Sequence, residues 1–149
     1  MNTYKAHVMK TDVPNDNGML YSSEVMDKAI NQYNEKVEKR TALGELKIIG
    51  RSFETEEEYV GRGKVVQLDK VSHLITNIKR TGSDIDCTLQ VLNTQNGLIL
   101  ENILKAFGVK KHGLVNDVVT VSSRGIGAVK NKTHVDDYTF IAIDIFPKE

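Results

Sequence analysis

The segment 138–146 constrains the fold of this chain more than any other. It is apolar on both of its strand faces, apart from Asp144. A strand that is apolar on both faces is buried on both faces, which is typical of a strand in the middle of a sheet. We therefore expect residues 138–146 to be a central strand, with other strands paired to it.

Several other segments have the apolar patterning or strand-forming composition of β-strands. By residue number, the expected strands are 4–8, 43–49, 64–68, 71–79, 85–91 and 118–123. A turn at 81–84 joins two of them into a hairpin. All hairpins expected from these lengths are short.

Two segments have the periodicity of amphipathic helices. Residues 23–39 place Val25, Ala29 and Tyr33 four apart on one stripe, and residues 98–107 form a shorter apolar helix that stops at Gly108. About six or seven strands and two helices, mixed in order along the chain, predict an α+β fold. We expect a largely antiparallel β-sheet or barrel within one domain, residues 1–149.

Composition excludes several classes of function. The 20 basic and 20 acidic side chains cancel, so no net positive charge favours nucleic acid as a partner. No apolar run approaches the roughly 18 residues of a membrane span, and no signal peptide is recognisable. The single cysteine, Cys87, is expected in the core and suits a reducing cytoplasm. No two histidines have metal-ligand spacing, so we expect no metal and no cofactor.

The segment Val-Ser-Ser-Arg-Gly-Ile-Gly at 121–127 is the strongest candidate for chemistry. A serine nucleophile needs a base within about 3 Å, and Ser122 or Ser123 could be that nucleophile. Arg124 and the backbone at Gly125 could stabilise an oxyanion. Paired serines beside glycines are more often a strand end or a turn, and this interpretation is favoured if the segment is taken alone.

The candidate bases are the four histidines. His7, His112 and His134 lie in segments that predict solvent exposure, whereas His73 shares a strand face with Val71 and Ile75. A histidine in that position is more often a packed residue with a backbone partner than a base. Sequence spacing does not decide between these roles, because catalytic triads are assembled in space.

Five motifs, in order, resemble those of the procapsid (prohead core) proteases of tailed bacteriophages, serine proteases related in fold to herpesvirus assemblin. The matching segments are 21–33, 42–46, 68–75, 121–127 and 143–145. The resemblance implies that Ser122 is the nucleophile position. It implies only a weak role for Asp144, at a place where the family also has an aspartate.

The resemblance also identifies what is missing. In the family, the catalytic histidine follows Gly-Glu-Leu by two positions, which corresponds here to Ile48. Isoleucine neither accepts nor donates a proton, and loss of a triad member costs about 10⁴–10⁶ in rate. The replacement argues against enzymatic activity and leaves Ser122, Arg124 and Asp144 as framework.

These features predict a non-enzymatic capsid or capsid-assembly protein of a phage, derived from a prohead protease. It would bind the major capsid protein or other virion proteins, in many copies on a symmetric particle assembled in the host cytoplasm. The alternative is an active maturation protease that cleaves scaffold and capsid proteins, with Ser122 as nucleophile and His73 as base. A third hypothesis, a tail-tube or tail-assembly protein, requires a long hairpin for ring formation.

Overall fold

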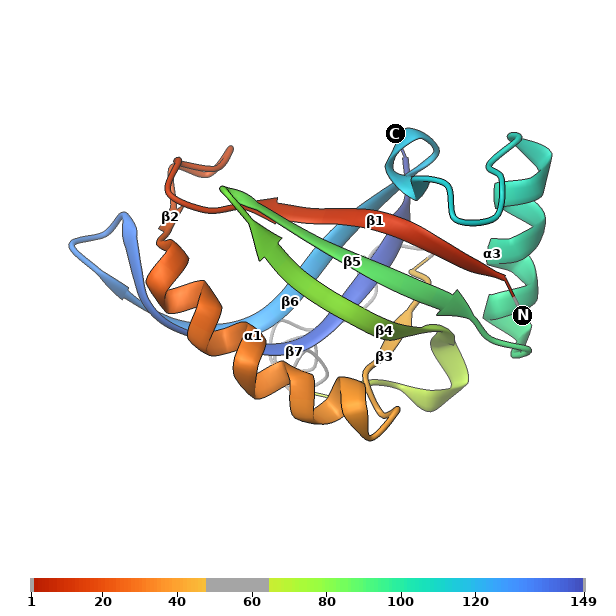
Figure 1. Cartoon of the computed structure of the whole chain (residues 1–149), viewed down its shortest axis with the longest axis horizontal. Helices are drawn as coiled ribbons and strands as arrows, with labels where there is room; N and C mark the ends of the chain where they lie inside the picture. Colours follow the sequence, from red (N-terminus) through yellow and green to blue (C-terminus); the bar gives the residue numbers. More distant parts are fainter. Residues whose placement is uncertain (1, 48–64, 149) are drawn as a thin grey trace, which may run out of the picture.

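Seven strands in two sheets and two α-helices make up the described part of the chain, residues 2–47 and 65–148 of the computed structural model (Figure 1). In chain order the elements are β1 (Thr3–Lys10), β2 (Leu20–Tyr21), α1 (Ser23–Glu38), β3 (Leu43–Glu45), β4 (Val71–Thr81), β5 (Asp84–Val91), α3 (Gln95–Ala106), β6 (Val119–Lys130) and β7 (His134–Pro147). Two 3₁₀ turns, Leu68–Lys70 and Val115–Asp117, precede β4 and β6. The predicted α+β class is confirmed.

The strands form one sheet of order β1-β5-β4-β3 and another of order β2-β7-β6. All pairings within the two sheets are antiparallel except β2 with β7. β7 contains the segment 138–146 and lies in the middle of its sheet, as its two apolar faces predict. The two sheets meet where Leu46 bridges Ile145 and the N–H of Lys47 donates to the carbonyl of Ile145 at 2.8 Å.

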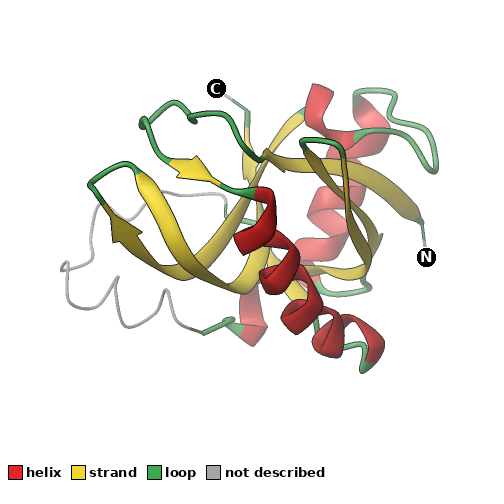
Figure 2. Cartoon of the chain, turned by 60° about the vertical axis from the view of Figure 1, so that its left-hand side comes forward, coloured by secondary structure: helices red, strands yellow, loops and turns green. Residues whose placement is uncertain are grey.

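Helix α1 covers the core on the side of β4 and β7 (Figure 2). Its buried residues include Met26, Ala29 and Tyr33, so the predicted stripe faces inward. The helix begins where the Ser22 hydroxyl accepts a hydrogen bond from the N–H of Val25. Neither described helix is long and apolar enough to cross a membrane.

Helix α3 starts three residues earlier than predicted, because Thr94 caps it. The Thr94 hydroxyl accepts from the N–H of Gly97 at 2.9 Å and donates to the carbonyl of Val71 on β4. Gly97 is needed there, since a Cβ at this position would lie 1.8 Å from the carbonyl oxygen of Leu92. The polar residues just before the predicted helix therefore form its N-cap and first turn. Its C-terminal end is as predicted, with Gly108 at φ +77°.

Two strand predictions need correction. The strand expected at 64–68 is absent over its described residues, because Leu68 begins a 3₁₀ turn. The expectation of short hairpins is also wrong, since β6 and β7 form a hairpin of 12 and 14 residues. The outer half of β6, residues 125–130, is exposed at every position and so lacks the alternation that marks a half-buried strand.

Candidate functional site

Ser122 lies on β6, directly opposite Asp144 of β7. Its side chain borders a groove of about 300 Å³, and its hydroxyl donates to the carbonyl of Ser123 at 3.4 Å. The residues that line this groove are Tyr21, Lys47, Ser122, Ser123, Arg124, Gly125, Tyr138, Asp144 and Phe146. A second cavity, of about 550 Å³, shares Tyr21 and Ser122 with the first and extends along the loop at 13–17. The Ser122 hydroxyl, the predicted nucleophile, is thus accessible from a polar surface depression.

His73 is not directed at this groove. It is fully buried on β4, where Nε2 lies 2.8 Å from the carbonyl oxygen of Ile143 and Nδ1 lies 2.7 Å from the Ser72 hydroxyl. A carbonyl only accepts, so Nε2 carries the proton and Nδ1 accepts from Ser72. Burial lowers the pKa of His73 to about 4, which keeps the ring neutral. The side chain therefore connects the two sheets, and this geometry disfavours it as a base for Ser122.

Gly44 makes the position of His73 possible. Gly44 pairs with His73 across β3 and β4. A Cβ on Gly44 would lie 2.1 Å from His73 Nε2 and 2.3 Å from the carbonyl oxygen of Ile143, which is inside van der Waals contact. The glycine of the Gly-Glu-Leu motif is thus explained by packing against an imidazole ring.

A largely buried ionic network lies at the groove, and two of its members, Arg124 and Asp144, line it. Arg124 Nε is 2.9 Å from Asp144 Oδ2, and Arg124 Nη2 is 2.8 Å from Glu45 Oε2. Arg124 Nη1 also donates to the carbonyl of Val65 at 2.7 Å, and the N–H of Glu45 donates to Asp144 Oδ1 at 3.0 Å. Both carboxylates are 1% exposed. The guanidinium that could stabilise an oxyanion is thus bonded to two carboxylates of the protein itself.

Desolvation opposes ionisation in this network. Burial raises the pKa of Asp144, while Arg124 and the N–H of Glu45 act in the other direction. Among the described residues, Glu45 Oε1 has no hydrogen-bond partner, and Lys47 Nζ lies 4.0 Å away. Glu45 was not predicted as a site residue. In the sequence, Glu45 is one of two charged residues, with Lys47, in the strand expected at 43–49, and its own position does not single it out.

Gly125 serves the packing of Tyr138. The hydroxyl of Tyr138 donates to Ser123 Oγ at 3.1 Å, and a Cβ on Gly125 would lie 2.4 Å from Tyr138 Cζ. Burial raises the pKa of Tyr138 to about 12, so the phenol stays protonated and acts as a donor. The aromatic ring of Tyr138 therefore occupies the space in which a side chain at position 125 would lie.

The other three histidines have partners of their own. His7 Nδ1 lies 3.0 Å from Asp86 Oδ1, His112 Nδ1 lies 2.9 Å from the Thr3 hydroxyl, and His134 Nδ1 lies 3.0 Å from the Thr133 hydroxyl. All four histidines of the chain are within the described residues, and each has its hydrogen bonds with groups other than Ser122. Ile48, where the family resemblance predicts a replaced histidine, lies outside the described residues.

Side chains that bind metals do not form a large enough group within residues 2–47 and 65–148. Within these ranges, no group of three or more histidine, cysteine, aspartate or glutamate side chains could hold a metal ion. The acidic pair of Glu45 and Asp144 is already bound to Arg124.

Comparison with known proteins adds two findings. A family model described as prohead core protein serine protease matches residues 3–144. The solved structure of the bacteriophage T4 capsid assembly protease, gp21, superimposes with a TM-score of 0.75 at 21% identity, over 99% of this chain and 82% of that one. At this identity the structural likeness shows a common fold. A search of the curated proteins finds no match.

Proposed function

Because this chain belongs to the prohead core serine protease family, we propose that it acts in phage capsid assembly as a non-proteolytic, capsid-binding protein. The observation that carries the proposal is the surroundings of Ser122. Its hydroxyl is accessible, yet its hydrogen bond goes to a backbone carbonyl, and none of the hydrogen bonds that the four histidines make is to Ser122. A hydroxyl without a base is a poor nucleophile.

Proton transfer is the step that the site does not support. The family position for the base is Ile48, which has no group that titrates. Recruiting His73 would require its ring to leave the Ser72 hydroxyl and the Ile143 carbonyl. The pKa of His73, which is about 4, would also have to rise toward the value near 7 that suits a general base. These costs disfavour the alternative of an active maturation protease.

Arg124 is also poorly placed to stabilise an oxyanion beside Ser122. An oxyanion formed beside Ser122 would compete with Asp144 and Glu45 for Arg124, whose guanidinium is bonded to both carboxylates. Electrostatic catalysis needs donors that are preorganised toward the developing charge. Here the donors are preorganised toward the protein itself, which supports a structural role for the residues that the family uses around its nucleophile.

The partner we propose is the capsid protein lattice, with other virion proteins as further candidates. A prohead protease works inside a shell of capsid and scaffold proteins, so a family member without activity keeps a reason to bind them. On this proposal the chain stays in the virion, in many copies, after assembly in the host cytoplasm.

A cleavage assay with the natural partners tests the proposal. The purified protein is incubated with the capsid and scaffold proteins of its own phage, and intact masses are followed against Ser122→Ala as the matched control. We expect identical, uncleaved partner masses in both samples, and co-sedimentation of the protein with assembled shells. Cleavage that disappears in Ser122→Ala would contradict the proposal and support the active protease.

A further inference from the structure

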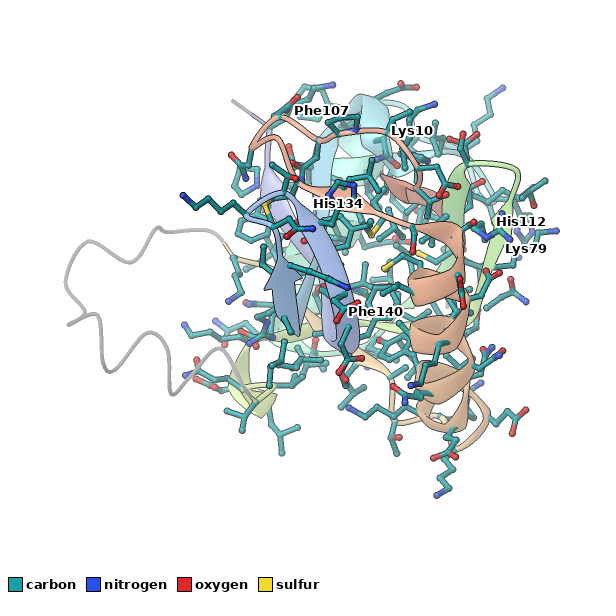
Figure 3. All side chains as sticks on the ribbon, turned by 90° about the vertical axis from the view of Figure 1, so that its left-hand side faces the viewer. Lys10, Lys79, Phe107, His112, His134 and Phe140 are labelled. Atoms are coloured by element: carbon teal, nitrogen blue, oxygen red, sulfur yellow. The ribbon has the colours of Figure 1, made fainter. Side chains whose placement is uncertain are left out.

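On the side away from β7, no described strand pairs with the outer half of strand β6, residues 125–130, and we call this side the open edge. In the sheet of order β2-β7-β6, β7 is held by β2 and α1, while β6 has β7 as its one partner strand among the described residues (Figure 2). Figure 3 shows β7 of this hairpin beside α1, with His134 and Phe140 labelled. The ring of Phe140 packs against the ring of Tyr33 on the helix, and their centroids are 5.4 Å apart. The hairpin is therefore anchored through β7, and β6 faces outward.

The chemistry of this edge favours pairing with another strand. Residues 125–129 read Gly-Ile-Gly-Ala-Val, without a charge or a proline, and Ile126 and Val129 are 53% and 54% exposed. Natural proteins usually protect such edges with lysine, proline or bulges. The two irregularities of the hairpin fall on β7, whose register skips Ile141 and Asp136, so β6 itself stays continuous.

We propose that the open edge pairs with the same edge of a second copy of this chain, antiparallel and about a twofold axis at Gly127. The side chains are self-complementary in this register. Val129 lies opposite Gly125 of the second copy, and Ile126 lies opposite Ala128, so each large residue meets a small one. The result is a continuous sheet of order β2-β7-β6-β6-β7-β2.

Charge also favours a second copy as the occupant. The chain has a formal net charge of zero, so two copies do not repel at long range. At the ends of the paired segment Lys130 meets Arg124 of the second copy, but the charge of Arg124 is neutralised by Asp144 and Glu45. A twofold interface uses the same patch on both subunits, which a self-complementary strand satisfies.

The pairing involves few residues, so we expect a weak dimer that becomes significant at the high local concentration of an assembling particle. The inference goes beyond the proposed function and does not depend on whether Ser122 is reactive. Sedimentation equilibrium from roughly 10 µM to 1 mM, the range of weak affinities, should show a monomer–dimer equilibrium. Ile126→Lys should raise the dissociation constant at least tenfold, because the two added charges lie on one face of the paired sheet as diagonal neighbours across the axis.

The matched control is Leu98→Lys, which adds the same charge at a site on α3 that is 52% exposed. It should dimerise as the wild type does, and both variants should keep the wild-type unfolding temperature. A monomer at the highest concentration, or a dimer that Ile126→Lys leaves unchanged, would overturn the proposal. Binding of an extended peptide at this edge by a strictly monomeric protein would overturn it as well.

Disulfide trapping tests the register. Opposed residues of antiparallel strands have Cα separations of about 4.5–5.5 Å, within the range of a disulfide. A mixture of Ile126→Cys and Ala128→Cys proteins should form mixed disulfides faster than a mixture of Leu98→Cys and Ala128→Cys, and Cys87 is buried and does not interfere. Equal rates in the two mixtures would contradict the register.

Discussion

The buried imidazole of His73 makes the stability of this protein depend on pH in a defined direction. The pKa of His73 is about 4 in the folded chain, against 6.5 when unfolded. Between these values the unfolded chain binds the extra proton, so the free energy of unfolding falls as the pH falls from about 6.5 toward 4. Above pH 6.5 the contribution is fully present, and below 4 the loss is complete.

The magnitude follows from the difference of about 2.5 pKa units between the two states. At about 1.4 kcal/mol per unit this amounts to roughly 3 kcal/mol in total, of which about 2 kcal/mol is lost by pH 5. Urea unfolding at pH 7.5 and pH 5 measures the loss. The control is His73→Gln, which replaces the ring N–H donor with an amide N–H donor and removes the titration, so that the carboxylates contribute equally to both proteins.

We expect the wild type to lose about 2 kcal/mol more than His73→Gln between pH 7.5 and pH 5. Equal losses in the two proteins would refute this reasoning. An NMR titration of the His73 ring measures its pKa in the folded protein directly. A midpoint between pH 6 and 7 would mean that His73 is hydrated and available as a base, and would favour the active-protease alternative.

Two further substitutions test the framework around the groove. Gly44→Ala should destabilise the protein by about 3 kcal/mol or more, because the added methyl group displaces His73 from the Ile143 carbonyl. Thermal unfolding measures the destabilisation, and the pKa of His73 should rise toward 6.5. Arg124→Ala should lower the free energy of unfolding by about 3–5 kcal/mol at pH 7, because it leaves the buried carboxylates of Glu45 and Asp144 without their cation. Urea unfolding measures this loss, which should shrink as the pH falls.

The exposed ion pair of Lys10 with Asp84, 3.3 Å apart, supplies the control for Arg124→Ala. Lys10→Ala should change the free energy of unfolding by less than about 1 kcal/mol. An Arg124→Ala protein as stable as Lys10→Ala would contradict the account of the buried network. A fully stable Gly44→Ala protein would show that His73 does not need its present position.

Local patterns predicted the fold well where a segment faces the core. The two apolar faces of β7 and the stripe of α1 are properties of consecutive residues, and both elements lie where these patterns indicate. The outer half of β6 was missed because an exposed strand pairs through its backbone and leaves no alternation in its side chains. The start of α3 was missed because Thr94 is oriented partly by the carbonyl of Val71, which is distant in sequence.

The site illustrates the same limit. The sequence indicates Ser122 as the candidate nucleophile and Ile48 as the replaced base, and these assignments remain predictions. What Arg124 does depends on Glu45, 79 residues earlier in the chain, so its role as the cation of a buried network was not visible from its own motif. Gly125 likewise has its role from Tyr138, which reaches it across the hairpin.

We propose that the Ser122 hydroxyl is unreactive, and labelling with an organophosphonate measures this reactivity. The protein and its Ser122→Ala variant are treated in parallel from pH 6 to pH 9, and adducts are located by peptide mass spectrometry. We predict no labelling of Ser122 above the background of the variant at any pH. Stoichiometric modification of Ser122, with a rate that rises through a single ionisation, would contradict the claim.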